Sequence, residues 1–522
     1  MTPRKQIASE RRAKQAAKKH SAARKQSGKK AAGAKAPTPI ASEILPKKQS
    51  VKLRSEKSIV SLPFGKDRGK DGAPSQRSRM EKTQVLRRAT LAQDDRAGEA
   101  EPQWVEIEKA TYGGAFLARL EGKAVFVPLT LPGEQARVRI TQSRQGYAAG
   151  EVEEIMRAAP ERIAPACPHF GSCGGCHYQH TDYENQLAFK QAILRETLER
   201  GGVRVPPEIA VLRGEPWHYR NRIRLAFDSA GQVGYRGRNS HAVVPVRECP
   251  IAAPLLVEAA LACAEIAREV APALRPTEIA LFCNADETAL LATVFTASPT
   301  KQRFDELAQE LHNRIPALTG AELVVESKGE LPQTIARWGA ATLNYCAAGF
   351  DYRVDHGAFF QVNRWLVDSL IERVVAGHTG KLAWDLFAGV GLFARQLAGC
   401  FERVVAVESA PSATAALKAN LHGTVGVAVE AETLAFLRRQ NLSVKPGLIV
   451  ADPPRIGLGA ESCALLAEIA APTVVCVSCD PATLARDLRA LINSGYEIES
   501  VTLADLFPQT FHLETVVQLR RS

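Results

Sequence analysis

The sequence predicts a multidomain chain that ends in an α/β, Rossmann-like domain and begins with a basic tail, a small β-barrel and an α+β domain. Three observations predict this. A length of 522 residues is too great for one ordinary core. After residue 103, short alternating strands recur about every ten residues. Over residues 356–522, apolar strands are mostly separated by helical segments, which is typical of a doubly wound, mostly parallel sheet.

The first hundred residues hold all of the excess positive charge. They contain 26 Lys and Arg against 9 Asp and Glu, a net charge of +17, whereas the remaining residues carry a net charge of −6. Residues 1–100 lack the apolar periodicity needed to bury a face, so we predict a disordered basic tail. Such a tail suits a nucleic-acid partner. A solubilising extension and an organelle transit peptide are the alternatives, whereas the lack of an apolar core argues against a secretory signal.

Composition excludes two classes of protein. No apolar run approaches the roughly 18 residues of a membrane span, and the best candidate, residues 464–479, is interrupted by Glu468 and Pro472. Eleven cysteines are too sparse for a disulfide scaffold. The sequence therefore predicts a reduced, cytoplasmic protein with no membrane partner.

The barrel and the α+β domain are predicted from strand and helix patterns. Five strands are expected in residues 103–158, enough for a small closed barrel of the oligonucleotide-binding type. An amphipathic helix is expected from Asn185 to the glycines at 201 and 202. The central domain, residues 159–355, mixes strands with helices at 255–270 and 300–314.

Unusual residues follow the strands of the C-terminal domain, where open α/β sheets bind ligands. They are Asp385 and Gly389, Glu408, Asp452 and Cys479, with Glu514 in the loop before the last strand. Their convergence predicts one site.

The stretch from Asp385 to Gly391 predicts a strand, a tight glycine turn and a helix. Glycines let the backbone approach a ligand, and Glu408 can accept hydrogen bonds from ribose hydroxyls. The pattern also matches a dinucleotide-type turn, but Asp385 favours the amino-acid end of S-adenosylmethionine (SAM) over a pyrophosphate. A glycine turn that only packs a helix is the alternative without a ligand.

Three further positions carry candidate chemistry. Asp452-Pro-Pro-Arg455 ends an apolar strand; an amino-group methyltransferase would have an aromatic residue in place of Arg455. Cys479 precedes a helix start whose amides could stabilise a thiolate, although a lone cysteine is more often a buried small hydrophobe. Glu514 is interpreted as a surface-loop carboxylate when considered alone. It becomes a candidate general base only if Cys479 is a nucleophile.

A cysteine cluster lies between the barrel and the central sheet. Cys167, Cys173 and Cys176 fall within ten residues, and Cys249 completes a set of four. Soft thiolates select zinc or an iron–sulfur cluster, and the spacing alone does not separate the two.

Together these motifs resemble one family, the SAM-dependent RNA (uracil-5-)methyltransferases, and within it the iron–sulfur branch that acts on bacterial 23S ribosomal RNA. The resemblance covers residues 103–522 and rests on GGAFLARLEGKAVFVPLTLPGE, C-x5-C-G-G-C with Cys249, FFQVN, DLFAGVG, ADPPR and SCDPATLARDL. It implies a TRAM barrel for RNA binding (residues 103–158), a central domain with the cluster (159–355) and a class I methyltransferase domain (356–522).

The resemblance also implies a role for individual residues. Four cysteines would hold a 4Fe-4S cluster: Cys167, Cys173, Cys176 and Cys249. Four residues would contact SAM: Gln361, Phe387, Glu408 and Asp452. Cys479 would attack uracil C6, Glu514 would be the general base, and Phe359 would stack on the flipped uracil. The chain departs from the family's usual residues at Leu392 and Asp480, and Leu392 puts one contact to the methionine end of SAM in doubt.

The expected partner is RNA, with 23S ribosomal RNA favoured, and a monomer is expected. Transfer RNA is the alternative substrate. An amino-group methyltransferase and a non-catalytic RNA-binding assembly factor are the alternative functions.

Overall fold

The computed structural model describes residues 101–298, 300–326, 332–440 and 443–522. The predicted disordered tail, residues 1–100, lies outside the described residues.

The first described element is a closed five-stranded barrel, as predicted. Its strands follow the order β1-β2-β3-β5-β4 around the barrel. Val105, Ile107 and Phe116 are buried in its core, because alternate residues of each strand point inward. The strands are β1 Gln103–Ala110, β2 Ala115–Leu120, β3 Lys123–Pro128, β4 Gln135–Arg144 and β5 Tyr147–Arg157.

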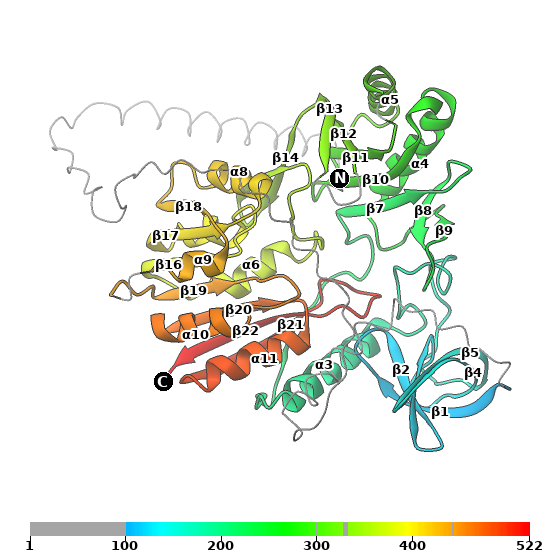
Figure 1. Ribbon diagram of the computed structural model, residues 1–522, viewed down its shortest axis with the longest axis horizontal. Coiled ribbons are helices and arrows are strands. Elements are labelled where there is room, and N and C mark those ends of the chain that lie inside the picture. The colour runs from blue at the N-terminus through cyan, green and yellow to red at the C-terminus, as the bar shows by residue number, and fades with distance from the viewer. Residues whose placement is uncertain (1–100, 299, 327–331, 441–442) are drawn as a thin grey trace, which may run out of the picture. The chain divides into compact units, whose positions relative to one another are not determined.

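The cysteine-rich segment follows the barrel and leads into helix α3 (Tyr183–Arg200). Asp182 caps the start of α3 by accepting a hydrogen bond from the Asn185 amide (2.8 Å). The helix ends at Arg200, before the glycines that the sequence indicated. In Figure 1, α3 lies beside α11 (Pro481–Ile492), and their apolar side chains share one core.

The central domain is a seven-stranded sheet with helices on one face. The strand order is β13-β12-β11-β10-β7-β8-β9. Helices α4 (Pro254–Glu269) and α5 (Lys301–Arg314) pack on it, close to their predicted bounds. A short 3-10 helix spans Pro272–Leu274. The strands are β7 Arg222–Phe227, β8 Val233–Arg236, β9 Val243–Pro245, β10 Pro276–Cys283, β11 Leu290–Thr296, β12 Leu318–Val325 and β13 Gln333–Gly339.

The C-terminal domain is an eight-stranded sheet covered on both faces (Figure 1). Its order is β18-β17-β16-β19-β20-β22-β21-β6, with parallel pairing from β18 to β20 and an antiparallel β22. The strands are β16 Gly380–Leu386, β17 Phe401–Glu408, β18 Gly426–Glu430, β19 Leu448–Ala451, β20 Thr473–Ser478, β21 Tyr496–Ala504 and β22 Glu514–Arg521. The helices are α6 Val367–Val375, α7 Leu392–Leu397, α8 Pro411–Asn420, α9 Thr433–Leu437, α10 Ala460–Ile469 and α11.

Two segments from before residue 356 join this domain. Strand β6 (Ala210–Leu212) pairs with β21 at the edge of the sheet. The hairpin β14 (Thr342–Ala347) and β15 (Phe350–Asp355) packs Tyr345 and Tyr352 into the core beneath α6 and α7. Position in the chain alone assigned both segments to the central domain. Their actual place depends on contacts with residues that are distant in sequence, which local patterns do not indicate.

Candidate active site

The strand order reverses between β16 and β19, and the crevice for a ligand lies at such a switch point. Leu386 pairs with Ala451 on one side and with Val407 on the other. The residues that follow these three, Phe387, Asp452 and Glu408, are therefore neighbours at the carboxyl edge of the sheet. The fold brings together three of the four residues that the resemblance assigned to SAM.

The glycine turn after β16 has the tight geometry that its sequence predicts. Phe387, Gly389 and Gly391 all have left-handed backbones, with φ of 62°, 55° and 90°. A Cβ at Gly391 would lie 2.6 Å from Cδ1 of Leu417, whereas a Cβ at Gly389 would meet no atom within 4 Å. Gly391 is thus needed for packing against α8, and Gly389 faces open space.

Two acidic residues hold this turn in place. Glu408 accepts hydrogen bonds from the amides of Gly389 (2.9 Å), Ser409 (2.8 Å) and Ala410 (2.7 Å). Asp385 accepts one from the amide of Ala394 (2.8 Å) through Oδ2. Its Oδ1 is buried and has no hydrogen-bond partner among the described residues. Burial raises the pKa of Asp385 to about 8, and the nearby charges of Asp452 and Glu408 act in the same direction. A bound cation would reverse this effect and favour the ionised carboxylate.

The FFQVN segment, residues 359–363, lies between β15 and α6 and contacts Asn221 just before β7 of the central domain. Gln361 is buried, and its carbonyl accepts a hydrogen bond from Nδ2 of Asn221 (2.9 Å). Phe360 is 2% exposed and packs against Tyr345, whereas Phe359 is 60% exposed. An aromatic ring held in solvent beside a buried one is available to stack on a base.

Cys479 and Glu514 lie at the ends of two neighbouring strands. Ser478 of β20 pairs with Thr515 of β22 in an antiparallel ladder, and Cys479 directly follows Ser478. Glu514 directly precedes Thr515 and is the first residue of β22, not part of the loop before it as the sequence suggested. The charge of Glu514 raises the pKa of the Cys479 thiol, which agrees with this proximity.

The Cys479 thiol is protonated at neutral pH. Burial and the negative charge of Glu514 raise the pKa of this thiol to about 11, against the positive charge of Arg455. The sequence suggested that amides at the start of α11 could stabilise a thiolate. Instead, Asp480 caps the helix by accepting hydrogen bonds from the amides of Ala482 (3.2 Å) and Thr483 (2.9 Å).

The carboxyls of Asp452 and Glu514 interact electrostatically; Glu514 is buried, whereas Asp452 is partly exposed. Burial raises the pKa of Asp452 to about 7. Burial and the nearby Asp452 charge raise the pKa of Glu514 well above its usual range. Oε1 of Glu514 has no hydrogen-bond partner among the described residues. The charge of Asp452 therefore disfavours the ionised form of Glu514, and a raised carboxyl pKa of this kind is suited to proton transfer.

The charge of Arg455 opposes the raised pKa values of both Cys479 and Glu514. Nη2 of Arg455 donates a hydrogen bond to Nδ1 of His512 (3.4 Å). Burial and the charge of Arg455 lower the pKa of His512 to about 3, which keeps the imidazole neutral and able to accept.

The barrel and the cysteine-rich segment also reach this site. The Tyr112 hydroxyl donates a hydrogen bond to the carbonyl of Cys479 (3.4 Å). The rings of Tyr112 and His177 both pack edge-on against Phe511, with centroids 5.6 and 4.7 Å apart. The sequence did not indicate these contacts, because they join parts of the chain more than 300 residues apart.

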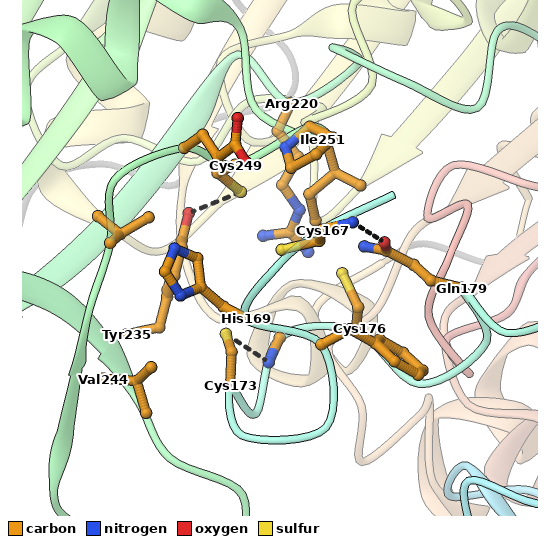
Figure 2. Close-up of a pocket in the computed structure, with 15 residues that line it drawn as sticks. Cys167, His169, Cys173, Cys176, Gln179, Arg220, Tyr235, Val244, Cys249 and Ile251 are labelled. Atoms are coloured by element: carbon orange, nitrogen blue, oxygen red, sulfur yellow. Dashed lines mark hydrogen bonds between the residues drawn. The ribbon is translucent and has the colours of Figure 1, made fainter. Parts of the chain in front are cut away.

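The four predicted cysteines line one cavity of about 40 Å³ (Figure 2). Cys173 accepts a hydrogen bond from the Gly175 amide (3.4 Å), and the Tyr235 hydroxyl lies 3.7 Å from Sγ of Cys249. Burial raises the pKa of the Cys176 thiol to about 12. Within the described ranges, no three His, Cys, Asp or Glu side chains are grouped as a site for one metal ion.

The charges around this cavity fit an anionic group. Arg220 lines it, and its Nε is buried without a hydrogen-bond partner in the described part of the chain. Arg238, which follows the Gly237 bridge to Cys173, has two such nitrogens. A cluster or ion bound by four thiolates is negative overall, so these two guanidinium groups, with nitrogens that lack partners, are suitable counter-charges.

Comparisons with known proteins decide the family. A model described as tRNA (uracil-5-)-methyltransferase matches residues 182–522, and the TRAM domain matches residues 100–152. The chain belongs to the tRNA (uracil-5-)-methyltransferase family. Its reaction class is therefore SAM-dependent methylation of uracil C5 in RNA.

Individual relatives agree with this membership. The chain is 32% identical to the 23S rRNA (uracil(1939)-C(5))-methyltransferase RlmD of Halomonas elongata, over 83% of this chain and 92% of that protein. It is 30% identical to an uncharacterized RNA methyltransferase of Thermotoga maritima, over 80% and 98%. The fold is similar to that of a Pyrococcus abyssi tRNA (uracil-54, C5)-methyltransferase solved with S-adenosyl-L-homocysteine (TM-score 0.65, 23% identity, 80% and 99% covered).

Two polar residues of α3 that are buried in the structure were not singled out from the sequence. Gln186 and Lys190 lie one turn apart on the face that packs into the protein. Polar residues at helical spacing on an otherwise apolar face were the available signal.

No helix of the described ranges is long and apolar enough to cross a bilayer.

Proposed function

We propose that the protein methylates C5 of a uridine in 23S ribosomal RNA through a covalent adduct between Cys479 and uracil C6. The observation that carries the proposal is that Cys479 and Glu514 flank the last pair of the β20–β22 ladder, Ser478–Thr515, and interact electrostatically. A nucleophile and a base that lie close together can act on C6 and C5 of the same ring.

Each step has a residue available for it. The Cys479 thiol gives its proton to water and its sulfur bonds to C6, which turns the C5–C6 double bond into an enolate with a nucleophilic C5. C5 then takes the methyl group of SAM, which leaves as S-adenosylhomocysteine. Glu514 then removes the C5 proton, and the Cys479–C6 bond breaks to restore the double bond and the thiolate.

Four residues support SAM binding: Gln361, Phe387, Glu408 and Asp452. Three of them stand at the switch point, and Glu408 already holds the amide of Gly389. Phe359 is the proposed stacking partner of the flipped uracil, since its ring is exposed.

We propose a 4Fe-4S cluster on Cys167, Cys173, Cys176 and Cys249, in a structural role. All four line one cavity, and the charges of Arg220 and Arg238 act on its cysteines. A cluster is favoured over a single zinc ion by the resemblance to the iron–sulfur branch of the family, because thiolates alone bind either group.

Ribosomal RNA is favoured because the named relatives of this length act on 23S rRNA. One chain supplies every proposed catalytic residue, which supports a monomer, and an RNA substrate supports a cytoplasmic location. Transfer RNA is the second candidate, because the similar Pyrococcus abyssi structure is named for it.

Nucleoside mass spectrometry tests the proposal on ribosomal and transfer RNA, purified separately from cells with and without the gene. Loss of 5-methyluridine from the large ribosomal RNA alone is expected. Loss from transfer RNA alone would support the proposed reaction but identify transfer RNA as the substrate. An unchanged 5-methyluridine content in both RNAs would contradict the proposed activity.

A further inference from the structure

The loop that delivers Glu514 is held by distant parts of the chain. Residues 505–513 connect β21 to β22 without a helix or strand. Gln509 at its centre has a left-handed backbone (φ 68°), which is costly for a residue with a side chain. Such a conformation persists only where surrounding contacts enforce it.

Gln186 of α3 supplies the most specific of these contacts. Its Oε1 accepts a hydrogen bond from the Gln509 amide (2.9 Å), and its Nε2 donates one to Oε1 of Gln509 (2.9 Å). Nε2 also donates to the carbonyls of Tyr178 (3.2 Å) and Thr181 (3.1 Å). Gln186 is fully buried, and both of its polar atoms are used.

Lys190, one turn further along α3, holds the start of the loop. Its Nζ donates to Oδ1 of Asp505 (2.6 Å) and to the carbonyl of Phe507 (2.9 Å). Both charged side chains are fully buried. A buried ion pair contributes little net stability, and one use for such a pair is to specify a single conformation.

The cysteine-rich segment completes the anchoring. The amides of His177 and Tyr178, the two residues after Cys176, donate to the carbonyl of Gln509 (2.8 and 3.1 Å). The Tyr219 hydroxyl donates to the carbonyl of Pro508 (3.0 Å). By contrast, Oε1 of the Glu514 carboxyl has no partner among the described residues, so the backbone of its loop and strand contributes to its position.

We propose that Gln186 is a positioning residue for the reaction: it fixes the left-handed turn at Gln509, and through it the placement of Glu514. This inference rests on the proposed function, in which Glu514 acts after methyl transfer. A displacement of about 1 Å in a catalytic group can reduce a rate up to about a hundredfold. Loss of Gln186 should therefore slow proton removal while leaving the attack of Cys479 and the methyl transfer intact.

The expected signature is a trapped intermediate. Gln186→Leu removes all four hydrogen bonds, and Gln509→Gly removes the side-chain pairing alone while retaining a backbone that favours positive φ. Both variants of the full chain should accumulate a methylated protein–RNA adduct, seen as a slowly migrating band on denaturing gels. Steady-state turnover should fall about tenfold or more, with the rate of the first methyl transfer unchanged.

Gln191→Leu is the matched control, because Gln191 lies on the same helix but donates to the carbonyl of Ile209 (3.0 Å) instead. It should show no adduct. Glu514→Gln is the reference and should accumulate the adduct most. If the reference accumulates it and neither Gln186→Leu nor Gln509→Gly does, the inference is overturned and the proposed function stands. If the reference itself fails, the role of Glu514 and this inference fall together.

Discussion

Cys479 and Glu514 flank the last pair of the antiparallel ladder β20–β22: Cys479 follows Ser478, and Glu514 precedes Thr515. Antiparallel pairing therefore brings the two residues to one end of the sheet. The parallel neighbour β19 adds Asp452 to the same edge, where it raises the pKa of both groups. The sheet thus brings together a thiol and two carboxyls that lie 27 and 35 positions apart along the sequence.

Covalent trapping should depend strongly on pH. The pKa of Cys479 is raised to about 11, so the thiolate fraction is small at neutral pH and grows with alkalinity. The rate of adduct formation with RNA containing 5-fluorouridine should rise by up to about tenfold per pH unit between pH 7 and 9. Gel shift under denaturing conditions measures it. Cys479→Ala should give no adduct at any pH, and persistent trapping would refute the nucleophile.

Asp385 should bind SAM better as pH rises. Its pKa of about 8 in the free protein means that a cationic ligand must ionise it, with release of a proton. Affinity measured by calorimetry should therefore increase from pH 6 to pH 8. Asp385→Asn should lose this dependence and weaken SAM binding about tenfold or more, since the amide carries no charge.

The Asp385 substitution should affect stability in the opposite direction. Because the folded pKa is raised, the wild-type carboxyl loses stabilisation as pH rises from about 4 to about 8. The neutral Asn variant should therefore resist urea better than the wild type at pH 8. An equal loss of stability and SAM affinity would instead assign Asp385 a purely structural role.

Two glycines of the turn should respond differently to alanine. Gly391→Ala places a Cβ 2.6 Å from Leu417 at φ 90°, so it should lower the free energy of unfolding by about 1–3 kcal/mol. At Gly389, Cβ meets nothing within 4 Å, and only the backbone strain applies. Gly389→Ala should be the milder change in urea unfolding but should weaken SAM binding, because its open space is the proposed ligand crevice.

The cysteine cavity should support the catalytic loop. Cys176→Ser should lower the bound iron and speed hydrogen exchange in residues 505–513, because His177 and Tyr178 hold the Gln509 carbonyl. Cys263→Ser, a buried cysteine of α4, is the control and should change neither. Elemental analysis that finds zinc instead of iron would contradict the cluster, and unchanged exchange would separate the cavity from the loop.

The sequence predicted the parts of the fold that local patterns determine. Barrel strands, helix α4 and the glycine turn after Asp385 each carry a periodicity or a turn motif within a few residues. Strand β6, with only three residues, and the β14–β15 hairpin carry no such signal, and their placement depends on the sheet and core that they join. The same limit applies to the site. Cys479 and Asp452 follow strands that the sequence pattern predicts. Gln186 instead contacts Gln509, which is 323 positions away in the sequence.

The central claim is that Cys479 and Glu514 act in succession on one uracil ring, and intact mass spectrometry of Glu514→Gln tests it most directly. After incubation with SAM and a uridine RNA substrate, a covalent adduct should form that carries one added methyl group and is absent from Cys479→Ala. Free Glu514→Gln protein alongside fully turned-over 5-methyluridine RNA would contradict the claim.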